Sequence, residues 1–188
     1  MREIARRHGL AVADKAESQE ICFVADGDYA AFIDRHYRDI MGRDVVPEAQ
    51  LSGEIVDVEG NRLGRHTGIH HFTIGQRKGL GIAHTSPYYV IDLQPESNCV
   101  VVGERAQLGS GGCRVRHCNW IAFAKLTNPL RVTARIRSRH QEASATVTPL
   151  DDGEALVEFD SPQMAVTPGQ ACVFYSGEKV VGGGWITR

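Results

Sequence analysis

The chain has 188 residues, of which 42% are hydrophobic and 23% charged, with a formal net charge of −2 and a pI near 6.4. This composition predicts a soluble globular protein of one or two small domains, and it excludes a chain that is basic throughout, so any RNA contact must come from a local patch. The sequence also has no apolar run of roughly 18 residues, no signal-peptide apolar region and an odd number of cysteines at irregular spacing, which excludes a membrane span and predicts a reducing cytoplasm.

Two helices are predicted in the N-terminal part. Residues 2–10 form a short basic segment that ends at Gly9, because glycine tolerates the left-handed backbone that closes many helices. Residues 27–37 place apolar side chains at positions 29, 32, 33 and 37 after Asp28, a suitable N-cap. This spacing is typical of an amphipathic helix.

After Pro47 the pattern shortens to strands and turns. The expected strands lie at 53–58, 63–66, 88–93, 98–103, 130–137 and 155–159, with a turn at 59–61. The glycine-rich residues 107–112 predict a flexible linker between a central β-rich domain with one helix (28–112) and a C-terminal domain (113–188). Short, evenly spaced strands predict a small closed β-barrel for the C-terminal domain. The predicted fold class is mainly β.

Cys22 lies among polar residues, with Lys15 upstream, directly before the apolar pair Phe23 and Val24. A partly exposed thiol near a lysine and hydrogen-bond donors favours the thiolate, which is the reactive form. The alternative is a small buried side chain, since free cysteine is among the most often buried residue types. The local sequence leaves both interpretations open.

Four arginines share one parity in and after the strand expected at 130–137: Arg131, Arg135, Arg137 and Arg139. A period of two places them on one face and the apolar Val132, Ala134 and Ile136 on the other. A charged face is usually just solvated. However, four like charges repel one another without an anion, and the planar fork of arginine suits phosphate oxygens. The pattern indicates either a solvated face or contact with a phosphate backbone.

A second basic patch, Arg77 and Lys78, lies in a loop between Gly75 and Gly81. The loop lacks the Gly-x4-Gly-Lys-Ser/Thr order of a nucleotide-binding loop, so we interpret it as facing RNA or an active site, with an exposed hairpin as the alternative. Gln170 follows a Pro-Gly turn. Its amide could read a base edge, although by itself it is an ordinary surface residue.

Two groups of residues have metal-ligand chemistry, Cys113-His117-Cys118 and His66-His70-His71. No second paired-ligand unit completes a tetrahedral set around either group, so we predict no metal site. Cys99 and Cys172 alternate with apolar neighbours and are predicted to be core residues.

Four segments, in the same order, resemble the tRNA-specific 2-thiouridylase family. They are 18–24 (SQEICFV), which is similar to the family's second active-site cysteine segment, 72–81 (FTIGQRKGLG), 165–171 (AVTPGQA) and 173–184. The resemblance covers nearly the whole chain and only the C-terminal half of the family. It implies the domain division given above, with residues 1–27 as the end of a catalytic domain.

The resemblance implies an enzyme that places sulfur on C2 of the wobble uridine, position 34, of tRNA. In this family ATP activates the uridine, a cysteine persulfide delivers sulfur, and the disulfide formed with the other catalytic cysteine is then reduced. Cys22 matches the persulfide-bearing cysteine. Arg137, Ser138 and Gln170 match positions that meet tRNA, although the family often has an aromatic residue in place of Ser138. To these we add, as predicted tRNA contacts, Arg135, Arg139, Arg77 and Lys78.

The family's N-terminal ATP-pyrophosphatase domain, with its phosphate loop and first catalytic cysteine, has no counterpart in this sequence. The resemblance therefore implies ATP and Mg²⁺ as cofactors of the whole enzyme that bind outside this chain, and an isolated chain without activity. The implied partners are tRNA, a persulfide sulfur donor and the catalytic domain, with no membrane. Two alternatives stay open, a non-catalytic tRNA-binding module and a subunit of a separate ATP-pyrophosphatase. A methyltransferase has less support, because the sequence shows no glycine-rich site for an adenosyl cofactor.

Overall fold

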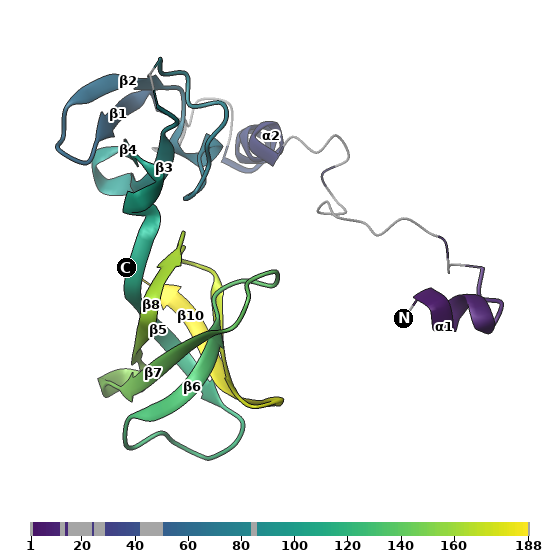
Figure 1. Cartoon of the computed structure of the whole chain (residues 1–188). Helices are drawn as coiled ribbons and strands as arrows, with labels where there is room; N and C mark the ends of the chain where they lie inside the picture. Colours follow the sequence, from purple (N-terminus) through teal and green to yellow (C-terminus); the bar gives the residue numbers. More distant parts are fainter. Residues whose placement is uncertain are drawn as a thin grey trace. The chain divides into compact units, whose positions relative to one another are not determined.

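The computed structural model describes residues 2–11, 14, 24, 29–41, 51–83 and 86–187. The chain divides into two compact units, Met1–Pro47 and Glu48–Arg188. The first unit contains helices α1 (Arg2–Arg7) and α2 (Tyr29–Met41) (Figure 1). Among the described helices, none is long and apolar enough to cross a membrane.

Helix α1 ends where the sequence predicts. Gly9 has a φ of 63°; its N–H donates to the carbonyl of Arg6, and the N–H of Leu10 donates to the carbonyl of Ala5, both at 3.0 Å. These two bonds form a Schellman motif, which satisfies carbonyls left free at the helix end. Helix α2 extends four residues past the predicted end at 37, and its predicted cap, Asp28, lies outside the described residues.

The second unit begins with a four-stranded sheet of order β2-β1-β4-β3. Its strands are β1 (Gly53–Asp57), β2 (Arg62–His66), β3 (Tyr89–Gln94) and β4 (Cys99–Gly103), with short 3₁₀ helices at Ile69–His71 and Pro95–Ser97. β1 and β4 are parallel, and the other neighbouring strands are antiparallel. A small core of buried aliphatic residues packs on this sheet: Ile55, Ile69, Leu80, Val90, Val100 and Val102.

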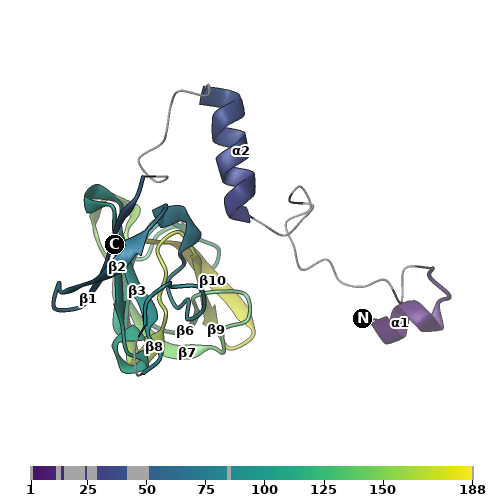
Figure 2. The same ribbon diagram turned by 90° about the horizontal axis from the view of Figure 1, so that it is seen from above.

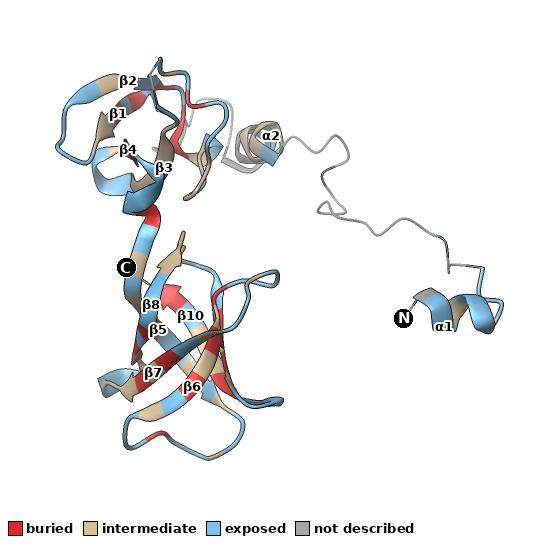
Figure 3. Ribbon diagram, viewed as in Figure 1, coloured by how far each residue is buried: buried red, intermediate tan, exposed pale blue. Residues whose placement is uncertain are grey.

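The rest of the unit is a closed six-stranded barrel of order β10-β5-β8-β7-β6-β9, whose ends join through the β9–β10 pair (Figures 1 and 2). The strands are β5 (Gly109–Trp120), β6 (Leu130–Arg135), β7 (Ala143–Pro149), β8 (Ala155–Met164), β9 (Ala171–Ser176) and β10 (Lys179–Thr187). Buried residues alternate with more exposed ones along β6, β7 and β8 (Figure 3). The predicted mainly β class and the C-terminal barrel are confirmed.

The glycine-rich residues 107–112 do not form the predicted flexible linker. Arg105–Leu108 is a 3₁₀ helix with a capping box at Glu104, and from Gly109 onward the chain is strand β5, paired with β8. A Cβ at Gly112 would overlap the carbonyl oxygen of Val157. Glycine therefore occurs here because two backbones approach closely, which composition alone cannot distinguish from a linker. The predicted domain boundaries themselves stay predictions.

Close approach of neighbouring strands also explains the triple glycine of β10, residues 182–184. A Cβ at Gly182 would lie 2.6 Å from Cε3 of Trp120 and 2.7 Å from the carbonyl oxygen of Asn119, and one at Gly183 would lie 2.7 Å from the carbonyl oxygen of Cys172. The Trp120 ring stacks on Phe174 at a centroid distance of 5.6 Å. The glycines thus let β10 pack closely against β5 and β9 and close the barrel.

Candidate nucleic-acid interface

Cys22 and Lys15 lie outside the described residues, so the catalytic assignment of Cys22 stays a prediction. The four other cysteines are all described as free thiols. Burial raises the pKa of the Cys99 and Cys118 thiols, with the carboxylates of Glu54 and Glu154 adding to the effect. These two thiols are therefore less readily ionised than a free cysteine.

The remaining pair, Cys113 and Cys172, lies in the barrel core with the two thiols hydrogen-bonded to each other. The thiol of Cys172 has a raised pKa because it shares this bond and is buried. Cys172 is a core residue, as predicted. The Cys118 thiol donates to the carbonyl of Val115 at 3.6 Å.

The predicted faces of the strand at 130–137 are confirmed for its apolar side. Val132, Ala134 and Ile136 are at most 6% exposed and belong to the barrel core. β6 ends at Arg135, so Arg137 and Arg139 lie in the turn that follows instead of on the strand. The basic residues therefore do not form one straight stripe.

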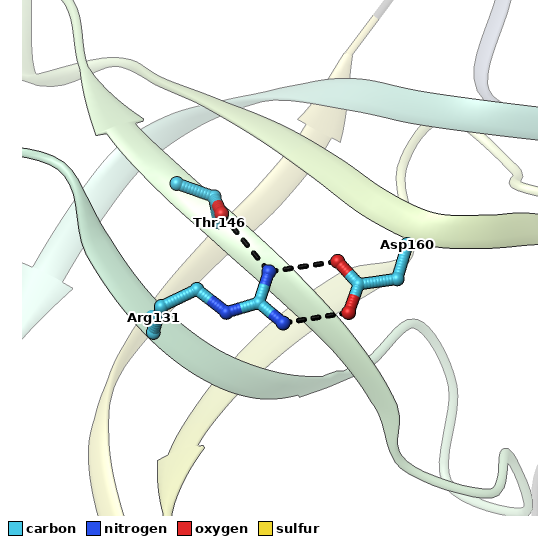
Figure 4. Close-up of polar contacts among 3 residues, drawn as sticks. All are labelled: Arg131, Thr146 and Asp160. Carbon is cyan, nitrogen blue, oxygen red and sulfur yellow. Dashed lines mark hydrogen bonds and ion pairs between the residues drawn. The ribbon is translucent and has the colours of Figure 1, made fainter.

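Two of the four arginines are already paired with carboxylates. Arg131 forms a two-point ion pair with Asp160, at 2.7 and 2.6 Å, and also donates to the hydroxyl of Thr146 at 3.2 Å (Figure 4). Arg135 pairs with Glu142 at 2.7 Å and lies over the Tyr175 ring, 5.3 Å from its centroid. The assumption that four unpaired cations repel one another is wrong for Arg131 and Arg135. A tRNA contact by Arg135 stays a prediction.

Arg137 opens a tight turn at the tip of the β6–β7 hairpin. The N–H of His140 donates to the carbonyl of Arg137 at 3.0 Å, which makes Ser138 and Arg139 the two central residues of a four-residue turn. Both are exposed. The guanidinium of Arg137 donates through Nη1 to the carbonyls of Met164 and Ala165, at 3.1 and 3.5 Å, so the turn is attached to the end of β8.

The segment after β8 carries Gln170 and is held by bonds of its own. Ala165 has a φ of 54°, and its N–H donates to the carbonyl of Leu108 at 3.0 Å. The hydroxyl of Thr167 donates to the carbonyl of Ala165 at 3.0 Å, and the N–H of Gln170 donates to the carbonyl of Thr167 at 3.2 Å. Gln170 is exposed. Arg137 and Gln170 are therefore linked through one short, bent segment.

The glycine loop of the sheet reaches the same segment. Gly75 has a φ of 88°, and a Cβ on it would lie 3.1 Å from the Cβ of Ala165. The side chain of Gln76 fixes the loop, because its Oε1 accepts from the N–H of Thr73 and its Nε2 donates to the carbonyl of Lys78, both at 3.0 Å. Arg77 is exposed and lines a cavity of about 380 Å³.

We call this meeting point the Ala165 corner, defined by Gly75, Arg137, Ala165, Thr167 and Gln170. The corner joins three stretches that are far apart in the sequence. It includes two of the predicted tRNA contacts, Arg137 and Gln170. Arg77 and Lys78 extend from the loop that touches it. Among the described residues, no carboxylate lies within ion-pair distance of four exposed cations of this region: Arg77, Lys78, Arg137 and Arg139.

The histidine cluster does not offer His66 to a metal. His66 is 4% exposed, accepts at Nδ1 from the N–H of Gly68 and bonds through Nε2 to the carbonyl of Asn98, both at 3.1 Å. An acceptor at Nδ1 means that Nε2 carries the proton. Burial is the main cause that lowers the pKa of His66, and His70 and His71 lower it further.

Sequence reasoning missed the partners of the arginines. Glu142 is seven residues from Arg135, and a hairpin expected between the two would have paired them. Asp160 is 29 residues from Arg131, and only the strand order β8-β7-β6 brings the two together. The carbonyls of Met164 and Ala165 gave no signal at all, because every residue has a carbonyl.

Comparison with known proteins shows the family to which the chain belongs. Residues 43–104 match the family model described as tRNA methyl transferase PRC-barrel domain, and residues 110–186 match the model described as aminomethyltransferase beta-barrel domain. The tRNA-specific 2-thiouridylases MnmA of Koribacter versatilis, Acidobacterium capsulatum and Moorella thermoacetica are each 50% identical to this chain over 99% of its length. The chain belongs to the tRNA-specific 2-thiouridylase family. It spans about half the length of these family members, 49% or 50% of each.

Proposed function

We propose that this chain binds tRNA at the Ala165 corner and takes part in the transfer of a persulfide sulfur to C2 of the uridine at position 34. The observation that carries the proposal is the convergence of two segments that resemble the 2-thiouridylases with a turn that holds two positions matched to the family, Arg137 and Ser138. The loop at 75–81, the turn at 137–140 and the segment at 164–170 meet at one residue, Ala165.

The charges of this region suit a phosphate backbone. Arg137 is held by two carbonyls through Nη1, which leaves its other N–H groups for an anion and fixes the direction of the side chain. Arg77 and Lys78 follow Gly75 in its loop, Arg139 lies in the same turn as Arg137, and all three side chains are exposed. Arginine can bond two phosphate oxygens at once, and such contacts position RNA without reading its sequence.

Cys22 is the proposed carrier of the sulfur. In a persulfide the outer sulfur attacks C2 of the uridine and a C–S bond forms, and the C2 oxygen would leave as part of AMP once ATP has activated it in the complete enzyme. The family's other catalytic cysteine, which has no counterpart in this sequence, would then attack Sγ of Cys22, which breaks the persulfide S–S bond, leaves the sulfur on C2 and forms the disulfide that is later reduced. A serine at this position keeps a similar shape but cannot hold the second sulfur. The resemblance alone supports this step, because residue 22 lies outside the described residues.

The glycine loop at 75–81 does not fit a phosphate-binding loop for ATP. At the start of the glycine loop the N–H of Gly75 donates to the carbonyl of Val90 at 2.8 Å and the N–H of Gln76 donates to the carbonyl of Thr73 at 2.9 Å, so neither is free to cradle a phosphate. We therefore assign no residue of this chain to ATP or Mg²⁺, which remain requirements of the proposed complete reaction.

The binding half of the proposal is tested by the salt dependence of tRNA affinity. Arg137→Ala is expected to weaken binding and to reduce the slope of log affinity against log salt by about 1, because one phosphate contact is lost. Arg114→Ala is the matched control. Arg114 is paired with Glu154 at 3.8 Å, next to the β7–β8 connection, whereas Arg137 lies in the β6–β7 connection at the other end of β7. Equal slopes for both variants would contradict the proposal.

The catalytic half is tested in a protein that joins this chain to the N-terminal half of the Koribacter versatilis relative. Cys22→Ser should abolish 2-thiouridine, measured by mass spectrometry of digested tRNA, while tRNA affinity is retained. Cys99→Ser is the control and should leave thiolation near the wild-type level. Normal 2-thiouridine formation by Cys22→Ser would remove Cys22 from the mechanism and favour the second candidate, a tRNA-binding module or subunit without catalytic residues.

A further inference from the structure

A groove opens where β7 and β8 separate. The two strands pair from Ala145 to Pro149 on β7 and from Ala155 to Phe159 on β8, whereas β8 continues to Met164 beside β5. The residues before Ala145 and after Phe159 therefore face each other without being joined as a ladder. The result is a cavity of about 530 Å³, within the roughly 300–1,000 Å³ of sites that hold small ligands.

The charges in this groove leave a single unpaired cation. Both carboxylates that line it, Glu142 and Asp160, are ion-paired with Arg135 and Arg131. Arg137 also lines the groove, and among the described residues its partners are two neutral carbonyls. The groove thus favours a ligand with one negative charge near Arg137.

His140 adds one hydrogen-bond donor and one acceptor, and its contacts show which ring nitrogen plays each role. The Nε2 of Gln163 donates to the carbonyl of Ser161 at 2.7 Å, which turns the Oε1 of Gln163 toward Nε2 of His140, 3.1 Å away. Nε2 of His140 is then the donor and Nδ1 the acceptor. Burial, and then the guanidinium of Arg137, lower the pKa of His140, so its ring stays neutral near pH 7.

The acceptor on His140 is unused. Its Nδ1 is buried and has no hydrogen-bond partner among the described residues, an arrangement that costs free energy until a donor arrives. The other polar groups of the groove include the hydroxyls of Ser144 and Ser161, and the described part of the chain contributes no Phe, Tyr or Trp to its lining. Bases are usually held by stacking on such rings, so this groove suits the sugar and phosphate of a nucleotide better than its base.

We propose that the groove between β7 and β8 holds one ribose-phosphate unit of bound RNA, with the phosphate on Arg137 and the ribose 2′-hydroxyl on the His140–Gln163 pair. The inference rests on the proposed function, because it takes tRNA as the ligand. It adds a contact that distinguishes RNA from DNA, since only RNA carries the 2′-hydroxyl. Because Nδ1 is buried in this structure, the contact requires the His140 ring to turn toward the groove when RNA binds.

The test combines affinity with chemical probing of riboses on a tRNA transcript. Wild-type protein should protect a short stretch of the transcript from 2′-hydroxyl acylation. His140→Ala and Gln163→Ala should each restore reactivity at one nucleotide of that stretch and weaken binding by about 5-fold to 30-fold, the equivalent of one or two hydrogen bonds. Their salt slopes should equal that of the wild type, because no charge is removed.

The outcomes separate the two proposals. Arg114→Ala should keep the protected nucleotide, and thermal unfolding confirms that each variant is folded. If wild-type protein binds tRNA and both groove variants keep its affinity and its protected nucleotides, the groove has another occupant, such as an extended peptide, and this inference is wrong while the proposed function stands. If wild-type protein binds no tRNA, the proposed function and this inference both fail.

Discussion

At the scale of single residues, the structure shows which polar side chains serve the fold and which are free to bind. His66 and Gln76 both occur in motifs that sequence reasoning connects with ligands, yet each uses its polar atoms to hold a neighbouring backbone. Arg137 differs from them, because carbonyls orient it without neutralising its charge. Function is therefore assigned by the partners of a side chain and not by its type.

His66 makes stability depend on pH. Because burial lowers its pKa below the ordinary value of 6.5, the unfolded chain binds more protons than the folded chain once the pH falls below about 6.5. The free energy of unfolding should therefore be highest above pH 6.5 and fall from there toward the lower folded-state pKa.

His66→Gln tests this prediction, since glutamine can still donate to the carbonyl of Asn98 but does not titrate. Urea unfolding at pH 7.5 and pH 5.5 should show a smaller pH difference for His66→Gln than for the wild type. The exposed His117, changed to asparagine, is the control and should keep the wild-type difference. His66→Ala should lower stability at both pH values by about 1–3 kcal/mol, because two backbone groups lose their partner.

Asp160 limits how basic the barrel surface is. Its hydrogen bonds with Arg131 lower the pKa of its carboxyl group, so both partners are charged and each neutralises the other. Asp160→Asn should free Arg131 and strengthen tRNA binding at low salt, with a salt slope steeper by up to about 1. Glu154→Gln, beside Arg114, is the control, and a weaker or unchanged affinity for Asp160→Asn would contradict the prediction.

At the scale of elements, close approaches of backbone decide how the strands and loops fit. β5 and β10 each contain glycine at positions where a Cβ would meet a neighbouring strand, as at Gly112 and Gly182. Gly75 occurs where the loop of the sheet touches the barrel. The close contact at Gly75 therefore helps to form the Ala165 corner.

Two substitutions distinguish a glycine that is needed because neighbouring atoms are close from a glycine that only makes the backbone more flexible. Gly182→Ala places a methyl group 2.6 Å from Trp120 and 2.7 Å from the carbonyl of Asn119, and should lower the free energy of unfolding by about 1–3 kcal/mol. Gly111→Ala has open space around the new methyl group, and should be neutral or stabilising by up to about 1 kcal/mol. Equal effects in denaturant unfolding would show that the glycines serve another purpose.

The contact between loop and barrel can be measured as a coupling energy. Gly75→Ala should destabilise by about 1–2 kcal/mol because of its positive φ, and more because the new methyl group meets Ala165 at 3.1 Å. Ala165→Gly removes this contact, and it also relieves the left-handed backbone of residue 165 (φ 54°), an effect that is present with either residue at position 75 and therefore cancels in the double-mutant comparison. The double variant should therefore be more stable than the sum of the single changes predicts, by about 0.5 kcal/mol or more, and strict additivity would mean that the two segments do not touch in solution.

At the scale of the whole molecule, the chain unites a small mixed sheet and a closed barrel within one compact unit, and it covers about half of each curated relative. The proposed tRNA contacts come from both the sheet and the barrel. The proposed chemistry also needs Cys22 in the other unit.

We expect this chain to bind tRNA but to release no AMP and form no 2-thiouridine by itself, because its sequence contains no phosphate loop for ATP. Adding the N-terminal half of a relative should restore both products. Thin-layer separation of labelled nucleotides and mass spectrometry of the tRNA measure the two outcomes. Release of AMP that depends on tRNA with this chain alone would show that ATP is used by residues assigned here to other roles.

The sequence by itself determined the mainly β class, the barrel, the stop of α1 at Gly9 and the buried side of β6, because these depend on local periodicity and on single backbone angles. It also determined the family, through four long segments in order. Tertiary structure alone decided that Arg131 is neutralised by Asp160, that Arg137 meets the backbone of Ala165 and that Gly112 of β5 is packed against a neighbouring strand instead of lying in a flexible linker. Those facts depend on strand order and register, which bring together atoms that are far apart in the chain and that no local pattern encodes.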